Sequence, residues 1–188
     1  MTIVLTQTIA QAAAPFAIRA ERASDIAPRE ALLDACFGGN RHGRTCQRLR
    51  DGRLPAEGLA FSAIHRGHVV GTVRLWHVDA GGRPALVLGP LAVDASVRAL
   101  GIGAALMEHA IAAAKALGHG AIILLGDAPY YARFGFAGDK VESLSLPGPF
   151  ERHRLLGLEL RPGALNGAFG LIVAAGSLAE VVRSARAA

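Results

Sequence analysis

The stretch that decides the fold is residues 85–106, which read ALVLGPLAVDASVRALGIGAAL. Its first nine residues are nearly all apolar, as in a strand that is buried on both faces. A short polar connection, residues 94–98, leads to Gly101 and Gly103, where a helix is predicted to begin. The first turn of a helix has unpaired backbone N–H groups, and glycines there let an anion approach them. The stretch therefore predicts a strand, a phosphate-binding turn and a helix.

The stretch continues into a strand–helix–strand unit. Apolar residues recur on one helical face from Ile102 to Leu117, and Gly118 ends the helix. Residues 121–125 form a second apolar run, so they are predicted to be a central strand parallel to the first. Hairpin patterns lie on both sides, which favours an α/β fold with a central mixed sheet and flanking helices. The other predicted elements are strands 16–20, 59–65, 68–78, 154–160 and 169–174, a strand after Phe136, and helices from Ser24 to Ala35, 128–134 and 177–187.

Composition and charge restrict the classes of function. The 188 residues are 52% hydrophobic and 19% charged, which is typical of a globular chain rather than a disordered one. We expect one domain over residues 15–188, after a loose, disordered N-terminal tail at residues 1–14. The net charge is +5, but the densest basic cluster, Arg41 to Arg53, has no interleaved aromatic residues, so no nucleic-acid partner is expected. That cluster is either a solvated surface or a rim that attracts an anionic ligand.

The cysteines and the N-terminus bear on the compartment. Cys36 and Cys46 are too few for a disulfide framework, and their spacing fits no metal motif, so both are predicted to be free thiols. The N-terminus lacks the basic start of a signal peptide, and no apolar run is long enough to span a membrane. We therefore expect a cytoplasmic protein without a membrane partner, and we predict no metal site.

The glycine turn fits a dinucleotide-binding fingerprint in part. Gly101 and Gly103 match its first two glycines, and Asp127 lies near the expected distance of its acidic residue. However, Leu106 stands where a third small residue is needed, and the turn begins eight residues beyond Val93. A P-loop is excluded because no Gly-Lys-Ser or Gly-Lys-Thr follows. An NAD(P)-dependent oxidoreductase is therefore a minor hypothesis.

Two segments carry a family resemblance. Residues 89–94 (GPLAVD) with 98–106 (RALGIGAAL), and residues 126–136 (GDAPYYARFGF), stand at a characteristic spacing. The first resembles motif A of the GNAT acyltransferases (GCN5-related N-acetyltransferases). The second resembles their segment from strand five to helix four, in a subgroup of small bacterial acetyltransferases with a Tyr-Tyr-x-Arg-Phe-Gly-Phe signature. The flanking strands are compatible with this acyl-CoA N-acyltransferase fold over residues 16–174.

The resemblance implies acetyl-CoA as the donor and direct transfer of its acetyl group to a primary amine of an unidentified small molecule or protein. A bulge at Gly89-Pro90 would open the strand edge for the pantetheine arm. Dimers are frequent in the family, so a homodimer is one expectation. A non-catalytic acyl-CoA-binding or regulatory module is the main alternative. The implied donor-binding residues are Leu91, Ala92 and Val93 for the arm, and Arg98, Ala99, Leu100, Gly101, Ile102, Gly103 and Ala104 for the pyrophosphate.

The resemblance also implies catalytic roles. Tyr131 matches the tyrosine that protonates the leaving thiolate, and the Val93 backbone N–H would stabilise the developing oxyanion. Tyr130 falls at a position that usually packs in the core. The general base is left open: a Glu, a His or an ordered water is expected, and His77 and Asp94 are candidates. Trp76 is assigned either to the acceptor pocket or to the core.

Two positions depart from the family pattern. Leu100 stands where many relatives carry Arg or Lys, and residues 126–127 replace an asparagine that is common after strand five. The first departure removes one side-chain contact to the pyrophosphate but leaves the backbone amides. Arg133 is left with two roles, contact with the 3′-phosphate of CoA or a surface pair.

Overall fold

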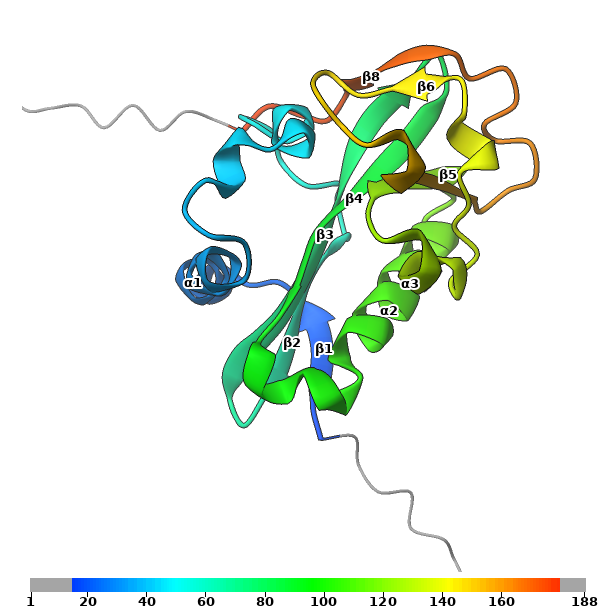
Figure 1. Cartoon of the computed structure of the whole chain (residues 1–188). Helices are drawn as coiled ribbons and strands as arrows, with labels where there is room; N and C mark the ends of the chain where they lie inside the picture. The colour runs from blue at the N-terminus through cyan, green and yellow to red at the C-terminus, as the bar shows by residue number, and fades with distance from the viewer. Residues whose placement is uncertain (1–14, 180–188) are drawn as a thin grey trace, which may run out of the picture.

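A central sheet organises the chain, as the computed structural model of residues 15–179 shows (Figure 1). The strands follow the order β1-β2-β3-β4-β5-β7, and β8 pairs with both β3 and β6. β4 and β5 pair in parallel, whereas β1 with β2, β2 with β3 and β3 with β4 pair antiparallel, so the predicted mixed sheet is confirmed. The strands are β1 (Ala17–Ala20), β2 (Ala60–His65), β3 (His68–Ala80), β4 (Pro84–Val93), β5 (Ala121–Leu125), β6 (Leu144–Ser145), β7 (Leu155–Glu159) and β8 (Gly170–Ala174).

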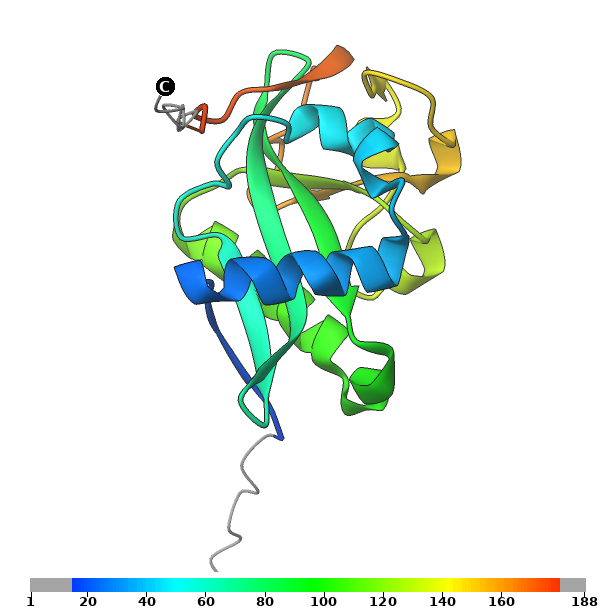
Figure 2. The same cartoon turned by 90° about the vertical axis from the view of Figure 1, so that its left-hand side faces the viewer.

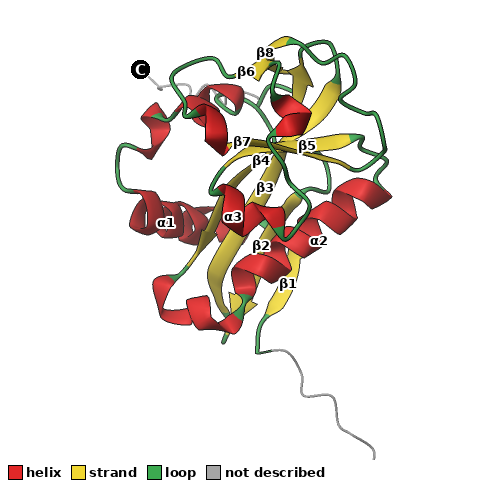
Figure 3. Ribbon diagram, turned by 45° about the vertical axis from the view of Figure 1, so that its right-hand side comes forward, coloured by secondary structure: helices red, strands yellow, loops and turns green. Residues whose placement is uncertain are grey.

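Helices cover both faces of the sheet. α1 lies across the strands on one face, and α2 and α3 lie on the other (Figures 2 and 3). This arrangement buries the apolar stripe of each helix and completes the predicted fold. The helices are α1 (Ile26–Phe37), α2 (Ile102–Ala116) and α3 (Ala128–Ala132), and the 3-10 turns are η1 (Ala23–Asp25), η2 (Arg41–Gly43), η3 (Thr45–Leu49), η4 (Ala95–Leu100), η5 (Asp139–Val141) and η6 (Arg152–Arg154).

The face under α2 holds the main core. Apolar residues spaced four apart on α2 are fully buried, among them Ile102 and Leu106. Each such side chain contributes about 2 kcal/mol through burial. Gly71 of β3 makes the close approach possible, because a Cβ there would lie 2.9 Å from Ile102 Cγ2 and 3.0 Å from Leu106 Cδ1. The helix N-terminus is therefore held firmly against the sheet.

β4 contains the predicted bulge. Leu75 and Val73 of β3 pair with Leu88 and Leu91, so Gly89 and Pro90 together oppose a single residue of β3. The parallel pairing of β4 with β5 extends only over Leu86 and Val87, and the two strands separate beyond the bulge. One edge of the second half of β4 is therefore free of a neighbouring strand, as the resemblance implied.

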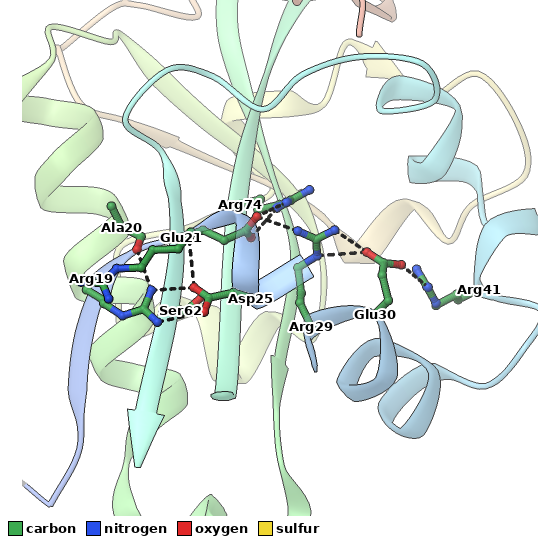
Figure 4. A network of polar contacts seen from close by, with 10 residues as sticks. Arg19, Ala20, Glu21, Asp25, Arg29, Glu30, Arg41, Ser62 and Arg74 are labelled. Carbon is green, nitrogen blue, oxygen red and sulfur yellow. Dashed lines mark hydrogen bonds and ion pairs between the residues drawn. The ribbon is translucent and has the colours of Figure 1, made fainter. Parts of the chain in front are cut away.

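An ion-pair network fastens α1 to the sheet (Figure 4). Arg29 of α1 is buried and donates to Glu21 at 2.6 Å and to Glu30 at 2.5 Å. Arg74 of β3 also donates to Glu21, and Arg41 donates to Glu30 at 2.5 Å. Removing one member of such a buried pair typically costs about 3 kcal/mol, because its partner is left uncompensated. The network fixes α1, which forms part of the site described below.

Several predicted elements differ from the structure. The first helix begins at Ile26, after η1, because the backbone at Ala23–Asp25 is a 3-10 turn. No strand begins directly after Phe136, since Ala137 makes only an isolated bridge to Gly157, and the next strand is the two-residue β6. Residues 177–179 are not helical, and Leu178 instead bridges to Arg53. The rest of the predicted terminal helix and the tail at residues 1–14 lie outside the described residues.

Candidate active site

Two cavities meet beside the free edge of β4. The first, of about 430 Å³, lies between β4, the N-terminus of α2 and α3. The second, of about 1130 Å³, lies between α1, the turns that follow it, the β4 bulge and the segment before β7. Phe37, Leu91 and Tyr130 line both cavities. This arrangement can hold two ligands whose ends approach each other near Leu91.

Most of the predicted donor-binding residues line the first cavity. Ala99 and Leu100 do not, because they lie on the exposed surface of η4. Ile102 does not either, since its side chain is fully buried in the core and anchors α2. The predicted residues that line the cavity are Leu91, Ala92, Val93, Arg98, Gly101, Gly103 and Ala104.

The glycine turn has the geometry of an anion site. Gly101 has a left-handed backbone, with φ of 74°, which reverses the chain from η4 into α2. At Gly103 an added Cβ would lie 3.2 Å from the Tyr130 hydroxyl oxygen and 3.6 Å from Val93 Cγ2. The first N–H groups of α2 and the positive end of its dipole therefore face a space that a side chain would fill.

The β4 backbone offers hydrogen-bonding groups to the same cavity. Asp94 N–H donates to Val70 of β3 at 2.8 Å. Because backbone groups alternate in direction along an antiparallel strand, the N–H and C=O groups of Leu91 and Val93 point away from β3. Consistently, the Val93 carbonyl lies 3.5 Å from the Cys36 thiol of α1. A ligand arm lying along this edge can pair with β4 as an added strand would.

Tyr131 and Tyr130 have different surroundings. Tyr131 packs on the main core, lines the second cavity and lies over Gly126, whose added Cβ would be only 2.1 Å from Tyr131 Cε2. Burial raises the pKa of the Tyr131 phenol to about 12, and Tyr130 acts in the same direction. Tyr130 is partly exposed and lines both cavities, so it is not the core residue that the sequence predicted.

The two candidates for the general base, His77 and Asp94, do not line either cavity. His77 lines neither one and stands beside His119, with 5.4 Å between ring centroids. Asp94 caps η4 by accepting from the Ser96 hydroxyl at 2.6 Å and its N–H at 2.8 Å. These hydrogen bonds from Ser96 hold the pKa of Asp94 below its usual range. Neither candidate therefore lines a cavity, and the identity of the base stays open.

Other side chains take their place in the second cavity. Asp127 and Glu151 are the carboxylates among its lining residues, and sequence reasoning missed both as candidate bases. Asp127 could have been found from its position directly after the predicted strand 121–125, but nothing local marks Glu151. Trp76 is buried in the core and donates to the Gly89 carbonyl at 2.7 Å, so it supports the bulge rather than lining the cavity.

The basic cluster of the sequence divides between cavity and surface. Arg41, Arg44 and Arg50 line the second cavity, together with Arg154. The sequence left open whether the cluster is a solvated surface or a rim that attracts an anionic ligand. For Arg41, Arg44 and Arg50 the structure favours the rim. Arg133 lines the first cavity, with its guanidinium carbon 4.1 Å from the centre of the Tyr130 ring. Its contact with a 3′-phosphate stays a prediction.

Comparison with known proteins agrees with this geometry. The acetyltransferase (GNAT) family profile matches residues 28–136. The uncharacterized N-acetyltransferase YhbS of Escherichia coli K12 is 31% identical over 162 residues, covering 82% of this chain and 93% of YhbS. Uncharacterized N-acetyltransferase YjhQ, from the same strain, is 30% identical over 77% of this chain and 84% of its own length.

Solved structures extend the likeness to the fold. A crystal structure of E. coli YhbS in complex with CoA matches with a TM-score of 0.74 and 30% identity, over 87% of this chain and 91% of that one. A GNAT acetyltransferase from Brucella melitensis, in complex with acetyl-CoA, matches with a TM-score of 0.59 and 25% identity, over 90% and 98%. Among residues 15–179, no helix is long and apolar enough to cross a membrane. By sequence and fold, this chain belongs to the GNAT family of acetyltransferases.

Proposed function

We propose that this chain transfers the acetyl group of acetyl-CoA directly to a primary amine. The observation that carries the proposal is the meeting of two cavities beside Leu91, one at the glycine turn and one lined by Tyr131. The first cavity fits the donor, because it combines a helix N-terminus with a free strand edge. The second, larger cavity fits the acceptor amine. The complexes of YhbS with CoA and of the Brucella protein with acetyl-CoA support the choice of donor.

The reaction needs a hydrogen-bond donor for the thioester oxygen. As the amine nitrogen attacks the carbonyl carbon, negative charge develops on that oxygen, and a fixed backbone N–H stabilises it. The Leu91 amide points toward the free edge where both cavities meet, whereas Val93 lies one strand repeat further inside the first cavity. We therefore assign this role to Leu91 in place of the expected Val93, whose amide then serves the pantetheine arm.

Protons must leave the amine and reach the sulfur. The Tyr131 hydroxyl, whose pKa is raised by burial to about 12, stays protonated at neutral pH and can donate to the leaving thiolate. Arg154, on the same wall, opposes that rise in pKa and so stabilises the tyrosine when it gives up its proton. We place the acceptor of the ammonium proton among the cavity carboxylates, Asp127 and Glu151.

The alternatives make different demands. A non-catalytic acyl-CoA-binding module would need the first cavity but not a tyrosine hydroxyl beside the second. An NAD(P)-dependent enzyme would have to bind NAD(P) more tightly than CoA.

We also propose a cytoplasmic location, because Cys36 and Cys46 are both free thiols.

Calorimetric titration with acetyl-CoA, with NAD(P) as the control ligand, tests the donor site first. Thiol release from acetyl-CoA is then followed with a panel of amines. Tyr131→Phe should leave the affinity for acetyl-CoA nearly unchanged and lower turnover at least about tenfold, since it removes one hydroxyl and keeps the ring. Equal turnover in the variant would remove Tyr131 from the reaction, and thiol release without amine acetylation would contradict the proposed acceptor.

A further inference from the structure

The second cavity contains an arginine without a partner among the described residues. The Arg50 Nε atom is buried and makes no hydrogen bond, and its guanidinium forms no ion pair within residues 15–179. Burial of an uncompensated charge is costly, and here it lowers the pKa of Arg50. Such groups are concentrated at ligand sites, where a bound ion supplies the missing partner.

The other arginines of this cavity are already engaged. Arg41 donates to Glu30 and to Asp34, at 2.5 Å and 2.6 Å (Figure 4 shows its pair with Glu30). Its charge is therefore neutralised within the network that holds α1.

Arg44 and Arg154 are held differently. Arg44 donates to the Phe37 carbonyl at 3.3 Å and lies over the Phe37 ring, 5.1 Å from its centre. Arg154 makes a long contact of 3.4 Å to the Gly126 carbonyl. Both therefore have a defined contact, and Arg50 is the side chain of this set that lacks one among the described residues.

Arg50 lies close to the reaction centre. Its Nη1 atom is 3.7 Å from the position that a Cβ on Gly89 would take, so the guanidinium lies against the β4 bulge. Gly89 is two residues from Leu91, in the bulged part of β4. One small molecule can therefore contact Arg50 with one end and bring another group to Leu91. The carboxylates of the same cavity, Asp127 and Glu151, favour a positively charged group at that other end.

We propose that Arg50 binds the carboxylate of the acceptor, so that the acceptor is a small amino acid-like molecule with both a primary amine and a carboxylate. The inference rests on the proposed acetyl transfer and names its substrate class. A guanidinium matches a carboxylate with two parallel hydrogen bonds, which fixes the orientation of the ligand as well as its affinity. The apolar walls at Leu88, Pro90 and Phe150 can accept the body of such a molecule.

The test compares amines that carry a carboxylate with their C-terminal amides, and each rate is referred to the concentration of the unprotonated amine. Thiol release from acetyl-CoA is measured with each amino acid that has a primary amine and no thiol, and with its C-terminal amide. We expect the best acid to exceed its amide at least about tenfold in kcat/KM, the effect of one charge-assisted contact. Arg50→Gln should bring the two members of the pair to similar values by lowering that of the acid, and Arg50→Lys should restore part of the preference.

Arg48→Gln is the matched control. Arg48 lies on the same turn and is exposed, and it lines neither cavity but donates to the Pro147 carbonyl at 2.7 Å. Arg48→Gln therefore removes one positive charge, as Arg50→Gln does, but should leave the preference for the acid over its amide unchanged. Circular dichroism and acetyl-CoA calorimetry on every variant verify that fold and donor site are intact.

Four outcomes overturn the inference. Equal rates for acids and amides in the wild-type protein, with acetyl-CoA bound, would refute the carboxylate site and leave the acetyltransferase proposal intact. A preference that survives in Arg50→Gln, or acetylation of neutral amines but of no amino acid, would do the same. Failure of the wild-type protein to bind acetyl-CoA would overturn the proposed function, and this inference with it.

Discussion

Gly126→Ala is a small substitution that should disable the site through Tyr131. The added Cβ would lie 2.1 Å from Tyr131 Cε2, 2.7 Å from Cδ2 and 3.0 Å from Cζ. Ordinary contacts begin near 3.4 Å, so the ring must retreat by at least about 1.3 Å. A misplacement of about 1 Å at a reacting group costs on the order of a hundredfold in rate. We therefore expect kcat to fall about a hundredfold while the affinity for acetyl-CoA changes little.

The assay combines thiol release, with the best amine from the panel, and calorimetry with acetyl-CoA. Gly39→Ala is the matched control, because nothing lies within 4 Å of its added Cβ and its backbone is not left-handed. The decisive comparison adds Gly126→Ala to Tyr131→Phe. If the glycine acts through the hydroxyl, the double variant should be no slower than Tyr131→Phe alone. A single Gly126→Ala variant with kcat within about twofold of wild type would refute the reasoning.

Two further predictions concern the donor site and the stability of the fold. Gly103→Val should weaken acetyl-CoA binding at least about tenfold in calorimetry, because the valine side chain enters the space beside Val93 and Tyr130. The control Ala112→Val, on the exposed side of α2, should leave the affinity unchanged. Equal affinities of the two variants for acetyl-CoA would exclude the glycine turn as the donor site. Asp25 is buried, and its hydrogen bonds from Arg19, at 2.5 Å and 2.8 Å, hold its pKa below the ordinary value. A lowered carboxyl pKa stabilises the fold fully above the unfolded-state value of about 4, and this contribution is lost as the pH falls toward the folded-state value. Asp25→Asn should therefore lower the free energy of urea unfolding at pH 7 by about 3 kcal/mol. It should also make that free energy fall less steeply with decreasing pH below about pH 4. The same pH dependence of unfolding in variant and wild type would contradict the role of the Asp25–Arg19 pair.

The central elements were predictable because their signals are local. The apolar runs and the helical periodicity of residues 85–125 predicted β4, α2 and β5 nearly to the residue. The hairpin at Arg66 and Gly67 was equally clear, and both residues have the positive φ that such a turn requires. The strand predicted directly after Phe136 was wrong, because Ala137 makes only an isolated bridge to Gly157 and strand pairing resumes only at the two-residue β6.

The candidate site was predictable in part. The glycine turn and Tyr131 stand in sequence motifs, and the structure places them beside two adjoining cavities. His77 and Asp94 could not be excluded from sequence, since a position in a strand or at its end does not show which neighbours a side chain faces. The different surroundings of Tyr130 and Tyr131 were also unpredictable, because adjacent residues on one short helix point in different directions and only the tertiary structure decides which one packs against the core.

The sequence by itself determined the family resemblance, the mixed sheet and the anion-binding turn, because each depends on residues close together in the chain. The tertiary structure alone decided what forms the second cavity. Arg50, Gly89, Asp127 and Glu151 come from four separate segments, and their juxtaposition depends on how α1 and the segment before β7 pack around the bulge of β4. Whether the charge of an arginine is compensated depends on such neighbours. That the guanidinium of Arg50 has no ion pair or hydrogen bond within residues 15–179 could therefore be recognised only in the folded chain.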